Sequence, residues 1–394
     1  MFARITNARK PIARFFAFMS LLWLAACDVT LATDANVGQQ IDTSKPIQVA
    51  LLVPGASAQQ TDNLLAQDFE NAARLAIADL QGARIDLRVY NTAGGNPAQA
   101  AFAAREAVND GAKIIIGPLY GEAANAAGVA IAGRDVNVLA FSNNRAFAGG
   151  NVFILGATFD NTADRLVKYA SRQGISRYMV LHGQDLPGQV GRDAISGAVQ
   201  NNGGEVVAVE SYPLSQQGIF SSTRKIVSTV RDSGAQAVFL TAGANADLPI
   251  VATALPDAGM NTERSRFIGL TRWDTLPQLV ALPGLEGGLF ALPDQGTSAL
   301  FENRYSATYG ELPHPLAGLA YDGIAAIGAL AAAGNTSALT KAELTQPQGF
   351  RGTAGVFRLL PNGLNQRGLA VATIQENQVV ILEQAPRNFG GPGL

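Results

Sequence analysis

The stretch KIIIGPLYGEAANAAG, residues Lys113–Gly128, decides how the rest of this chain is interpreted. Its three isoleucines, Ile114–Ile116, are apolar on every face, which is typical of a central parallel strand covered by helices on both sides. Gly117 and Pro118 end that strand, and the small residues that follow predict a helix beginning near Gly121. The first free N–H groups of this helix would lie at the carboxyl end of the sheet, where open α/β folds bind ligands.

Strand and helix patterns alternate on both sides of this stretch. Predicted strands start near residues 47, 85, 113 and 136, and a second series starts near 177, 205, 236 and 266. The repeat is one of architecture and not of sequence. Two such βαβαβαβ units predict two similar lobes, each built on a parallel sheet. A further strand, two helices and a set of antiparallel strands are predicted after them, at 287–293, 298–309, 316–333 and 350–383.

The composition excludes several functional classes. The chain has 394 residues, enough for two domains, with 47% hydrophobic and 15% charged residues and a formal net charge of −2. No basic patch suited to nucleic acid is present. No metalloprotease, serine-hydrolase, P-loop or dinucleotide-binding motif occurs, and the two histidines, His182 and His314, lie far apart. We therefore expect no enzyme activity, no cofactor and no metal site.

The pattern at the amino terminus predicts an export signal. A basic segment without acids, Met1–Arg14, precedes the apolar run Phe15–Ala26, which is too short to span a membrane but typical of a signal peptide. The following Leu-Ala-Ala-Cys, ending at Cys27, resembles the bacterial lipoprotein signal. The resemblance implies that Cys27 becomes the lipidated mature terminus. The alternative is an ordinary secretory signal with a chance cysteine.

Because Cys27 is the only cysteine of the chain, its lipidation would leave the exported part without a thiol. Disulfides, a cysteine nucleophile and cysteine metal ligands would then be excluded. We expect a periplasmic protein anchored by lipid to the outer or the inner membrane. Asp28 resembles an inner-membrane retention signal of enteric bacteria, but that rule does not hold in all bacteria, so the choice of membrane stays open.

The order of elements, together with the opening stretch, resembles the type 1 periplasmic-binding-protein fold, as in the Leu/Ile/Val-binding proteins. That fold has two Rossmann-like lobes with parallel sheets, joined by a three-segment hinge, and a ligand cleft between them. The resemblance implies crossings near 142–158, 271–285 and 335–349. It divides the chain into a signal peptide 1–26, a lipidated Cys27 with a flexible tether to 45, lobe one 46–148 plus 285–335, lobe two 152–272 plus 350–385, and a disordered tail 386–394.

Three stretches are similar to one branch of that fold, the penicillin-binding-protein activator lipoproteins. They are IIIGPLYGEA at 114–123, VNVLAFSNN at 136–144, and YASRQGISRYMVLHGQDLPGQVGRDAISGAVQNNGGEVVAVESYPL at 169–214. The resemblance implies a non-enzymatic factor that activates a penicillin-binding protein, a peptidoglycan synthase. The enteric activators carry a helical-repeat domain that is not seen before residue 46. The alternative is a solute-binding receptor that delivers branched-chain amino acids or related small ligands to the permease of an ABC importer.

The resemblance also implies which residues face the cleft, namely those at the carboxyl ends of the strands. Amino-acid receptors of this fold usually hold the ligand carboxylate with Ser or Thr after the third strand. This chain has Leu119, Tyr120, Gly121 and Glu122 there, so a side-chain hydroxyl is lacking or displaced. Backbone N–H groups at Glu122 and Ala123 could still hold an anion. The alternative is that this segment simply turns the chain.

Polar and aromatic residues follow three other predicted strands. Ser142, Asn143 and Asn144 follow the fourth strand, where such side chains either orient a ligand or form a turn. Asp185 follows the fifth strand. Trp273 and Asp274 follow the eighth, and Trp273 is either a stacking platform for a ligand or a buried hinge residue. These residues complete the predicted cleft.

Overall fold

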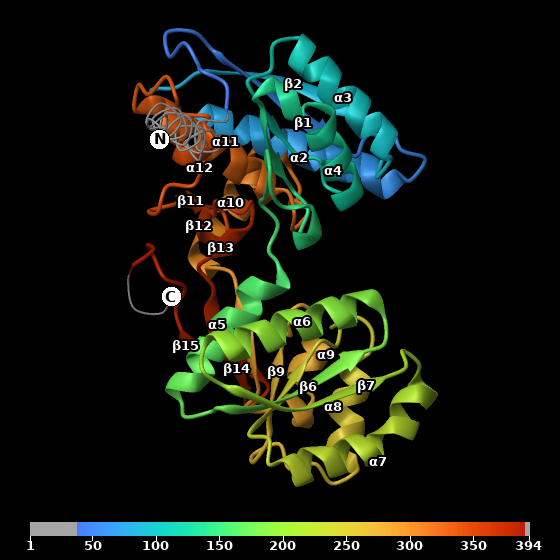
Figure 1. The fold of residues 1–394 in the computed structure, drawn as a ribbon. Coiled ribbons are helices and arrows are strands. Elements are labelled where there is room, and N and C mark those ends of the chain that lie inside the picture. The colour runs from blue at the N-terminus through green and yellow to red at the C-terminus, as the bar shows by residue number, and fades with distance from the viewer. Residues whose placement is uncertain (1–37, 391–394) are drawn as a thin grey trace, which may run out of the picture.

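The computed structural model describes residues 38–390, and Figure 1 shows that they form two lobes joined by a narrow region. The predicted signal peptide, Cys27 and residues 391–394 lie outside the described residues. Both lobes are α/β structures built on parallel strands, as the alternating pattern predicts.

The first lobe contains a five-stranded parallel sheet in the order β2-β1-β3-β4-β5. Its strands are β1 Ile47–Val53, β2 Ile85–Asn91, β3 Ile114–Ile116, β4 Asn137–Ala140 and β5 Val152–Ile154. Helices α3 Pro97–Asn109 and α4 Gly121–Ala130 cover one face, and α2 Gln60–Asp79 and α11 Gly318–Ala332 cover the other. Short helices η1 Ala132–Arg134 and η2 Arg145–Phe147 follow α4 and β4.

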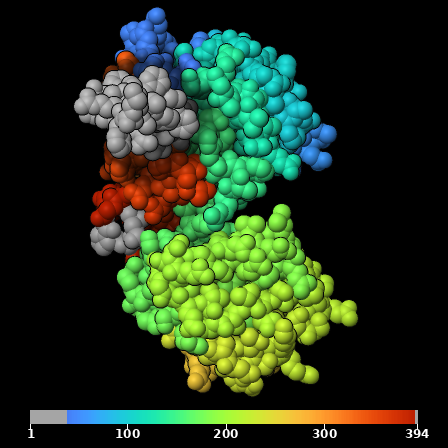
Figure 2. Space-filling model, viewed as in Figure 1, coloured from blue at the N-terminus to red at the C-terminus, as the bar shows by residue number. Residues whose placement is uncertain are grey.

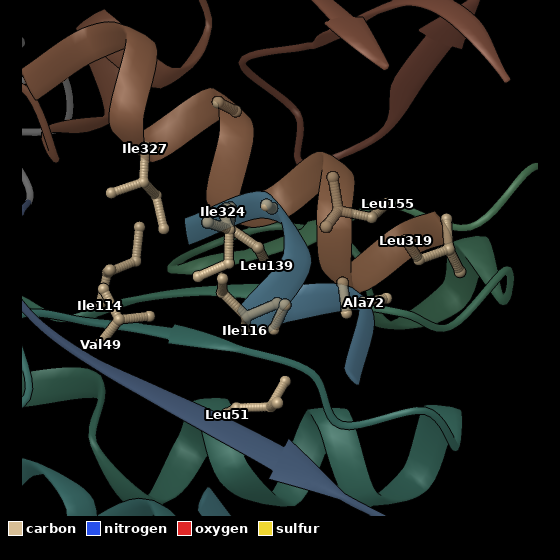
Figure 3. Close-up of a cluster of buried hydrophobic side chains, with 14 of the residues drawn as sticks. Val49, Leu51, Ala72, Ile114, Ile116, Leu139, Leu155, Leu319, Ile324 and Ile327 are labelled. Carbon is tan, nitrogen blue, oxygen red and sulfur yellow. The ribbon is translucent and has the colours of Figure 1, made fainter. Parts of the chain in front are cut away.

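Helix α11 comes from the far end of the sequence but completes the core of this lobe. In Figure 3, Ile324 and Ile327 of α11 lie over Ile114 and Ile116 of β3, and Leu319 of α11 belongs to the same core cluster. At Gly323 the helix lies so close to the sheet that a Cβ atom there would be 3.0 Å from Ile116 Cγ2. The small residues of α11 therefore permit close packing on a fully buried strand.

The second lobe contains a seven-stranded sheet in the order β15-β14-β10-β9-β8-β6-β7. Its strands are β6 Arg177–Gly183, β7 Glu205–Tyr212, β8 Ala237–Leu240, β9 Arg266–Gly269, β10 Leu289–Leu292, β14 Ala370–Gln375 and β15 Gln378–Glu383. Strands β14 and β15 are antiparallel to their neighbours. Helices α5 Phe159–Arg172 and α6 Leu186–Asn201 cover one face, and α7 Gln216–Ser233, α8 Leu248–Asp257, α9 Pro277–Val280 and η3 Pro283–Leu285 lie on the other.

The remaining elements lie beside the first lobe and the joining region. They are α10 Gln295–Tyr309, α12 Lys341–Leu344 and a small antiparallel sheet of β11 Phe350–Gly352, β12 Gly355–Leu359 and β13 Asn365–Arg367. Aromatic side chains of β11 and β12 belong to the core of the first lobe. The chain passes between the lobes at 155–158, 293–294 and 368–369, between β5 and α5, β10 and α10, and β13 and β14.

These boundaries correct the predicted domain division. Strand β5 joins the first sheet and not lobe two, because Val152–Ile154 pairs with β4. Strand β10 joins the second sheet and not lobe one, because it pairs with β9 and β14. The small sheet at 350–367 packs on lobe one, whereas only β14 and β15 extend lobe two. The predicted crossings at 271–285 and 335–349 are therefore wrong.

The two predicted flexible ends are partly ordered. Residues 38–45 lie on the first lobe, where Ile41 is 6% exposed and its N–H donates to the Thr336 carbonyl at 2.9 Å. At the other end, the Arg358 guanidinium lies 4.6 Å from the centre of the Phe389 ring. In each segment one apolar side chain packs on the folded protein. The free energy gained by this packing offsets part of the conformational entropy that is lost when a chain end is held in place.

Replacing Ile41 by Ala is expected to lower the free energy of unfolding by about 2 kcal/mol, because a buried aliphatic side chain is lost from a core. The matched control is Val129→Ala on α4, where the side chain is 69% exposed and little change is expected. Urea unfolding followed by circular dichroism measures both. Equal stability of the two variants would contradict the docking of residues 38–45.

Candidate functional site

The opening stretch forms the strand, turn and helix that the sequence predicts. Strand β3 ends at Ile116, and the next residue, Gly117, has φ of 83°; a Cβ atom there would lie 2.1 Å from the Leu52 carbonyl oxygen. Only glycine fits such a position. Helix α4 then begins at Gly121, close to the end of β4, since a Cβ atom on Gly121 would lie 3.3 Å from Asn144 Cβ. The tips of β3 and β4 therefore form one surface.

Tyr120 connects this surface to the start of α2. Its hydroxyl donates to Asp62 Oδ1 at 2.6 Å, and the Ser57 hydroxyl donates to Asp62 Oδ2 at 2.8 Å. The hydrogen bond to Asp62, together with partial burial, raises the pKa of Tyr120 to about 12. Leu119 is partly buried against the core of lobe one, and Glu122 is exposed in the first turn of α4. The polar groups at this tip thus bond mainly to one another.

The residues after β4 form a turn. Of the two roles predicted for them, ligand orientation and turn formation, the structure therefore shows the second. Ser142 is buried and its hydroxyl accepts a hydrogen bond from the Asn144 N–H at 3.0 Å. Asn144 in turn caps η2, because its Oδ1 accepts from the Ala146 N–H at 3.0 Å. Asn143 is exposed.

In lobe two the predicted residues also have structural partners. Asp185 caps α6, with Oδ1 accepting from the Gly188 N–H at 3.0 Å. Trp273 is fully buried and stacks on Phe290 with ring centroids 5.2 Å apart. Trp273 is therefore a buried residue of the lobe-two core and not an exposed stacking platform. Asp274 forms an ion pair with Arg272.

A cavity of about 650 Å³ lies between the lobes, beside the joining segments. In Figure 2 the surfaces of the two lobes separate on one side and meet near those segments. The cavity is lined by the residues that follow β8, β9 and β10, by the start of α5, by α11 and by the turn after β11. The lining residues are 157–159, 162, 243–246, 270–272, 275, 291–293, 315–316, 318–319, 322, 353–354, 367 and 369.

None of the predicted cleft residues lines this cavity. The cavity lies at the carboxyl ends of the lobe-two strands β8, β9 and β10, as expected for a parallel sheet, but the carboxyl ends of the lobe-one strands β3 and β4 do not line it. Arg272 lines it, whereas its neighbours Trp273 and Asp274 do not. The position of Arg272 directly after β9 was the feature of the sequence that could have identified it. Which of the three adjacent residues faces the cavity depends on the direction of each side chain.

Apolar and small side chains make up most of the cavity wall, with a few polar groups among them. Two of these groups form a buried ion pair. Asp322 of α11 and Arg367 of β13 are 1% and 5% exposed at their side chains, with Arg367 Nη1 3.6 Å from Asp322 Oδ2. Asp322 Oδ1 also accepts from the Thr353 N–H at 2.6 Å, and Arg367 Nη2 donates to the Leu155 carbonyl. Burial raises the pKa of Asp322, against the attraction of Arg367.

Arg272 is the other cation at the cavity. Its Nε donates to Asp274 Oδ1 at 3.0 Å and its Nη2 to Asp274 Oδ2 at 2.6 Å, a bidentate pair that fixes the plane of the guanidinium. The hydrogen bonds to Asp274 raise the pKa of Arg272, so it stays charged. Arg272 also lines an adjoining cavity of about 210 Å³ that contains Glu302 and His314.

Within residues 38–390, no group of three His, Cys, Asp or Glu side chains is placed to hold a metal ion. Nor does any helix in that range have the length and apolar character to cross a membrane. His182 lies at the end of β6 with its Nδ1 2.8 Å from the Gly183 carbonyl oxygen. The expectation that the protein is not an enzyme stays a prediction.

Comparison with known proteins agrees with this architecture. A curated relative, the uncharacterized protein RP748 of Rickettsia prowazekii, is 24% identical over 166 residues, which are 42% of this chain and 43% of that relative. The chain thus matches less than half the length of RP748.

Solved structures match over much more of the chain. A putative branched-chain amino acid ABC transporter from Rhodospirillum rubrum has a TM-score of 0.72 at 18% identity, over 86% of this chain and all of the other. A solute binding protein of an ABC transporter from Rhodopseudomonas palustris, in complex with 3,4-dihydroxybenzoic acid, has a TM-score of 0.57 at 18% identity, over 88% and 99%. The sequence profile of the family "Periplasmic binding protein" matches residues 46–378. The chain belongs to the periplasmic binding protein family.

Proposed function

We propose that this protein is a solute-binding receptor that takes a small organic ligand into the cavity between its lobes and presents it to the permease of an ABC importer. The observation that carries the proposal is the cavity itself, which is lined by residues of both lobes. A ligand held there would touch α11 of lobe one and the strand ends of lobe two, and so would favour a closed arrangement of the lobes.

The size and chemistry of the cavity support this function. Ligand pockets commonly measure about 300–1,000 Å³ and are mainly apolar with a few polar groups that orient the ligand. The volume of about 650 Å³, the apolar wall and the single exposed guanidinium of Arg272 fit that description. Several structural neighbours are named as substrate-binding or solute binding proteins of ABC transporters, and among them are complexes with leucine, with 3,4-dihydroxybenzoic acid and with 4-hydroxybenzoate.

A thermal-shift screen of amino acids, aliphatic acids, aromatic acids and amines tests the receptor function. A ligand at one hundred times its Kd stabilises the folded protein by about 2.7 kcal/mol, which raises Tm by several degrees. We expect Ala246→Trp, which fills the cavity from an exposed position after β8, to abolish the shift. The matched control is Ala146→Trp, also exposed but outside the cavity, which should keep it. A screen without any stabilising compound would contradict the receptor function.

Activation of a penicillin-binding protein is a second candidate, and it rests on a different observation. Tyr120, Asp62 and Ser57 bond to one another at the tips of lobe one, where an amino-acid receptor would need free groups for a ligand. This supports a role in which the binding-protein fold contacts another protein instead of a small ligand. Lipid attachment at Cys27 belongs to the same prediction and lies outside the described residues. The test is glycan polymerisation and crosslinking by a purified bifunctional synthase, with and without this protein.

A further inference from the structure

We propose that the cavity between the lobes recognises its ligand through a carboxylate, that Arg272 is the contact residue, and that no ammonium group is needed. This inference rests on the proposed receptor function and deepens it by naming the ligand class. It predicts that simple aliphatic or aromatic acids bind better than the corresponding α-amino acids.

Arg272 lines the cavity and has one edge of its guanidinium unused. A guanidinium has five N–H groups. The N–H groups at Nε and Nη2 are directed to Asp274, and Nη1 has no hydrogen-bond partner among the described residues. The side chain of Arg272 is 44% exposed and lines both cavities. Because Asp274 holds the guanidinium plane in place, Arg272 is already oriented to donate to a planar anion.

An ammonium group would find no comparable partner in the larger cavity. Asp322 is the only acidic residue among those lining it, and both of its oxygens are already used. One accepts from the Thr353 N–H and the other faces Arg367, with the side chain almost completely buried. Each of the two guanidinium groups at the cavity is paired with an aspartate, Arg272 with Asp274 and Arg367 with Asp322, so the group left free for a charged ligand is the remaining N–H edge of Arg272 and not a carboxylate.

The acids near the other strand ends are engaged as well. Asp62 accepts from Tyr120 and Ser57, and Asp247 accepts from the Tyr212 hydroxyl and the Gly243 N–H at 2.5 and 2.7 Å. Glu302 of the adjoining cavity is exposed and close enough to Arg272 to stabilise its charge. Among the residues that line these two cavities, Glu302 is therefore the one carboxylate that an amine could use, and the experiment must include it.

The test uses probes with one carbon skeleton and different charges, measured by isothermal titration calorimetry on the full chain. For the leucine skeleton the probes are 4-methylpentanoate, 4-methylpentanamide, 4-methylpentylamine and leucine. Benzoate, benzamide and benzylamine form an aromatic set. We expect the carboxylate of at least one set to bind, at least about tenfold more tightly than the matched amide and amine, and 4-methylpentanoate at least as tightly as leucine.

Variants identify the contact residue. Arg272→Gln should weaken the carboxylate at least about tenfold and leave the amide unchanged, whereas Arg272→Lys should retain part of the affinity. The matched control is Arg145→Gln, because Arg145 is an equally exposed arginine paired with an aspartate, Asp160, and does not line this cavity. Glu302→Gln should leave carboxylate binding intact or strengthen it.

The outcomes separate the two claims. An amide or amine that binds as tightly as its carboxylate, leucine that binds more tightly than 4-methylpentanoate, or an Arg272→Gln variant that behaves like Arg145→Gln would overturn this inference and leave the receptor function standing. If neither these probes nor the wider screen yields a bound compound, both claims are overturned.

Discussion

Replacing Asp322 by Leu is expected to lower the free energy of unfolding by about 3–5 kcal/mol, because it leaves the buried Arg367 without its counter-charge. The Thr353 N–H loses its acceptor in the same variant, since it donates to Asp322 Oδ1 at 2.6 Å. Arg367 lies at the end of β13 and also donates to Leu155 in a joining segment. The loss should therefore appear as lower stability in urea and as weaker coupling between the lobes.

The double variant Asp322→Leu with Arg367→Met distinguishes a buried charge penalty from simple loss of packing. Removing both charges together should cost less than the sum of the two single changes, as in other buried pairs. The exposed pair Arg177–Glu205 is the control, and Glu205→Gln should change stability by less than about 1 kcal/mol even though its N···O distance, 2.8 Å, is shorter. Additive effects at Asp322 and Arg367 would contradict the buried pair.

Replacing Trp273 by Ala should destabilise the protein by about 3–5 kcal/mol, because a fully buried indole is removed from the core of lobe two. The backbone is shaped around this ring, since a Cβ atom on Gly269 would lie 2.4 Å from Trp273 Nε1, and one on Gly288 would lie 2.7 Å from the ring. Urea unfolding measures the loss.

The milder variant Trp273→Phe keeps an aromatic ring on Phe290 and should cost clearly less. Because Trp273 does not line the cavity, this folded variant should bind the ligand of the wild-type protein with nearly unchanged Kd. A large loss of affinity in a stable Trp273→Phe protein would mean that Trp273 contacts the ligand, which is the stacking role considered from the sequence.

Much of the fold could be predicted from local pattern. The run Ile114–Ile116, the glycine after it and the alternation of strands and helices predict parallel sheets, because only a strand covered on both faces is apolar throughout. The pattern does not show which sheet a strand joins. Leu289–Leu292 is a buried apolar strand in either lobe, and its assignment to lobe two depends on hydrogen bonds to β9 and β14.

The candidate site was harder to predict because adjacent residues point in different directions. Arg272 lines the cavity, Trp273 is buried in the core of lobe two, and Asp274 forms an ion pair with Arg272. Position after a strand places all three at the correct end of the sheet, but only the course of the backbone assigns each side chain to its surroundings. The buried pair Asp322–Arg367 joins residues distant in sequence, and no local pattern could reveal it.

The most direct test of a ligand-binding cleft is a crystal structure of the protein with the carboxylate that binds most tightly in calorimetry. We predict that the ligand lies in the cavity between the lobes, with its carboxylate on Arg272 and its apolar part against α11 and the strand ends of lobe two. Ligand bound to one lobe only, or held away from Arg272 at the tips occupied by Tyr120 and Asp62, would contradict this account.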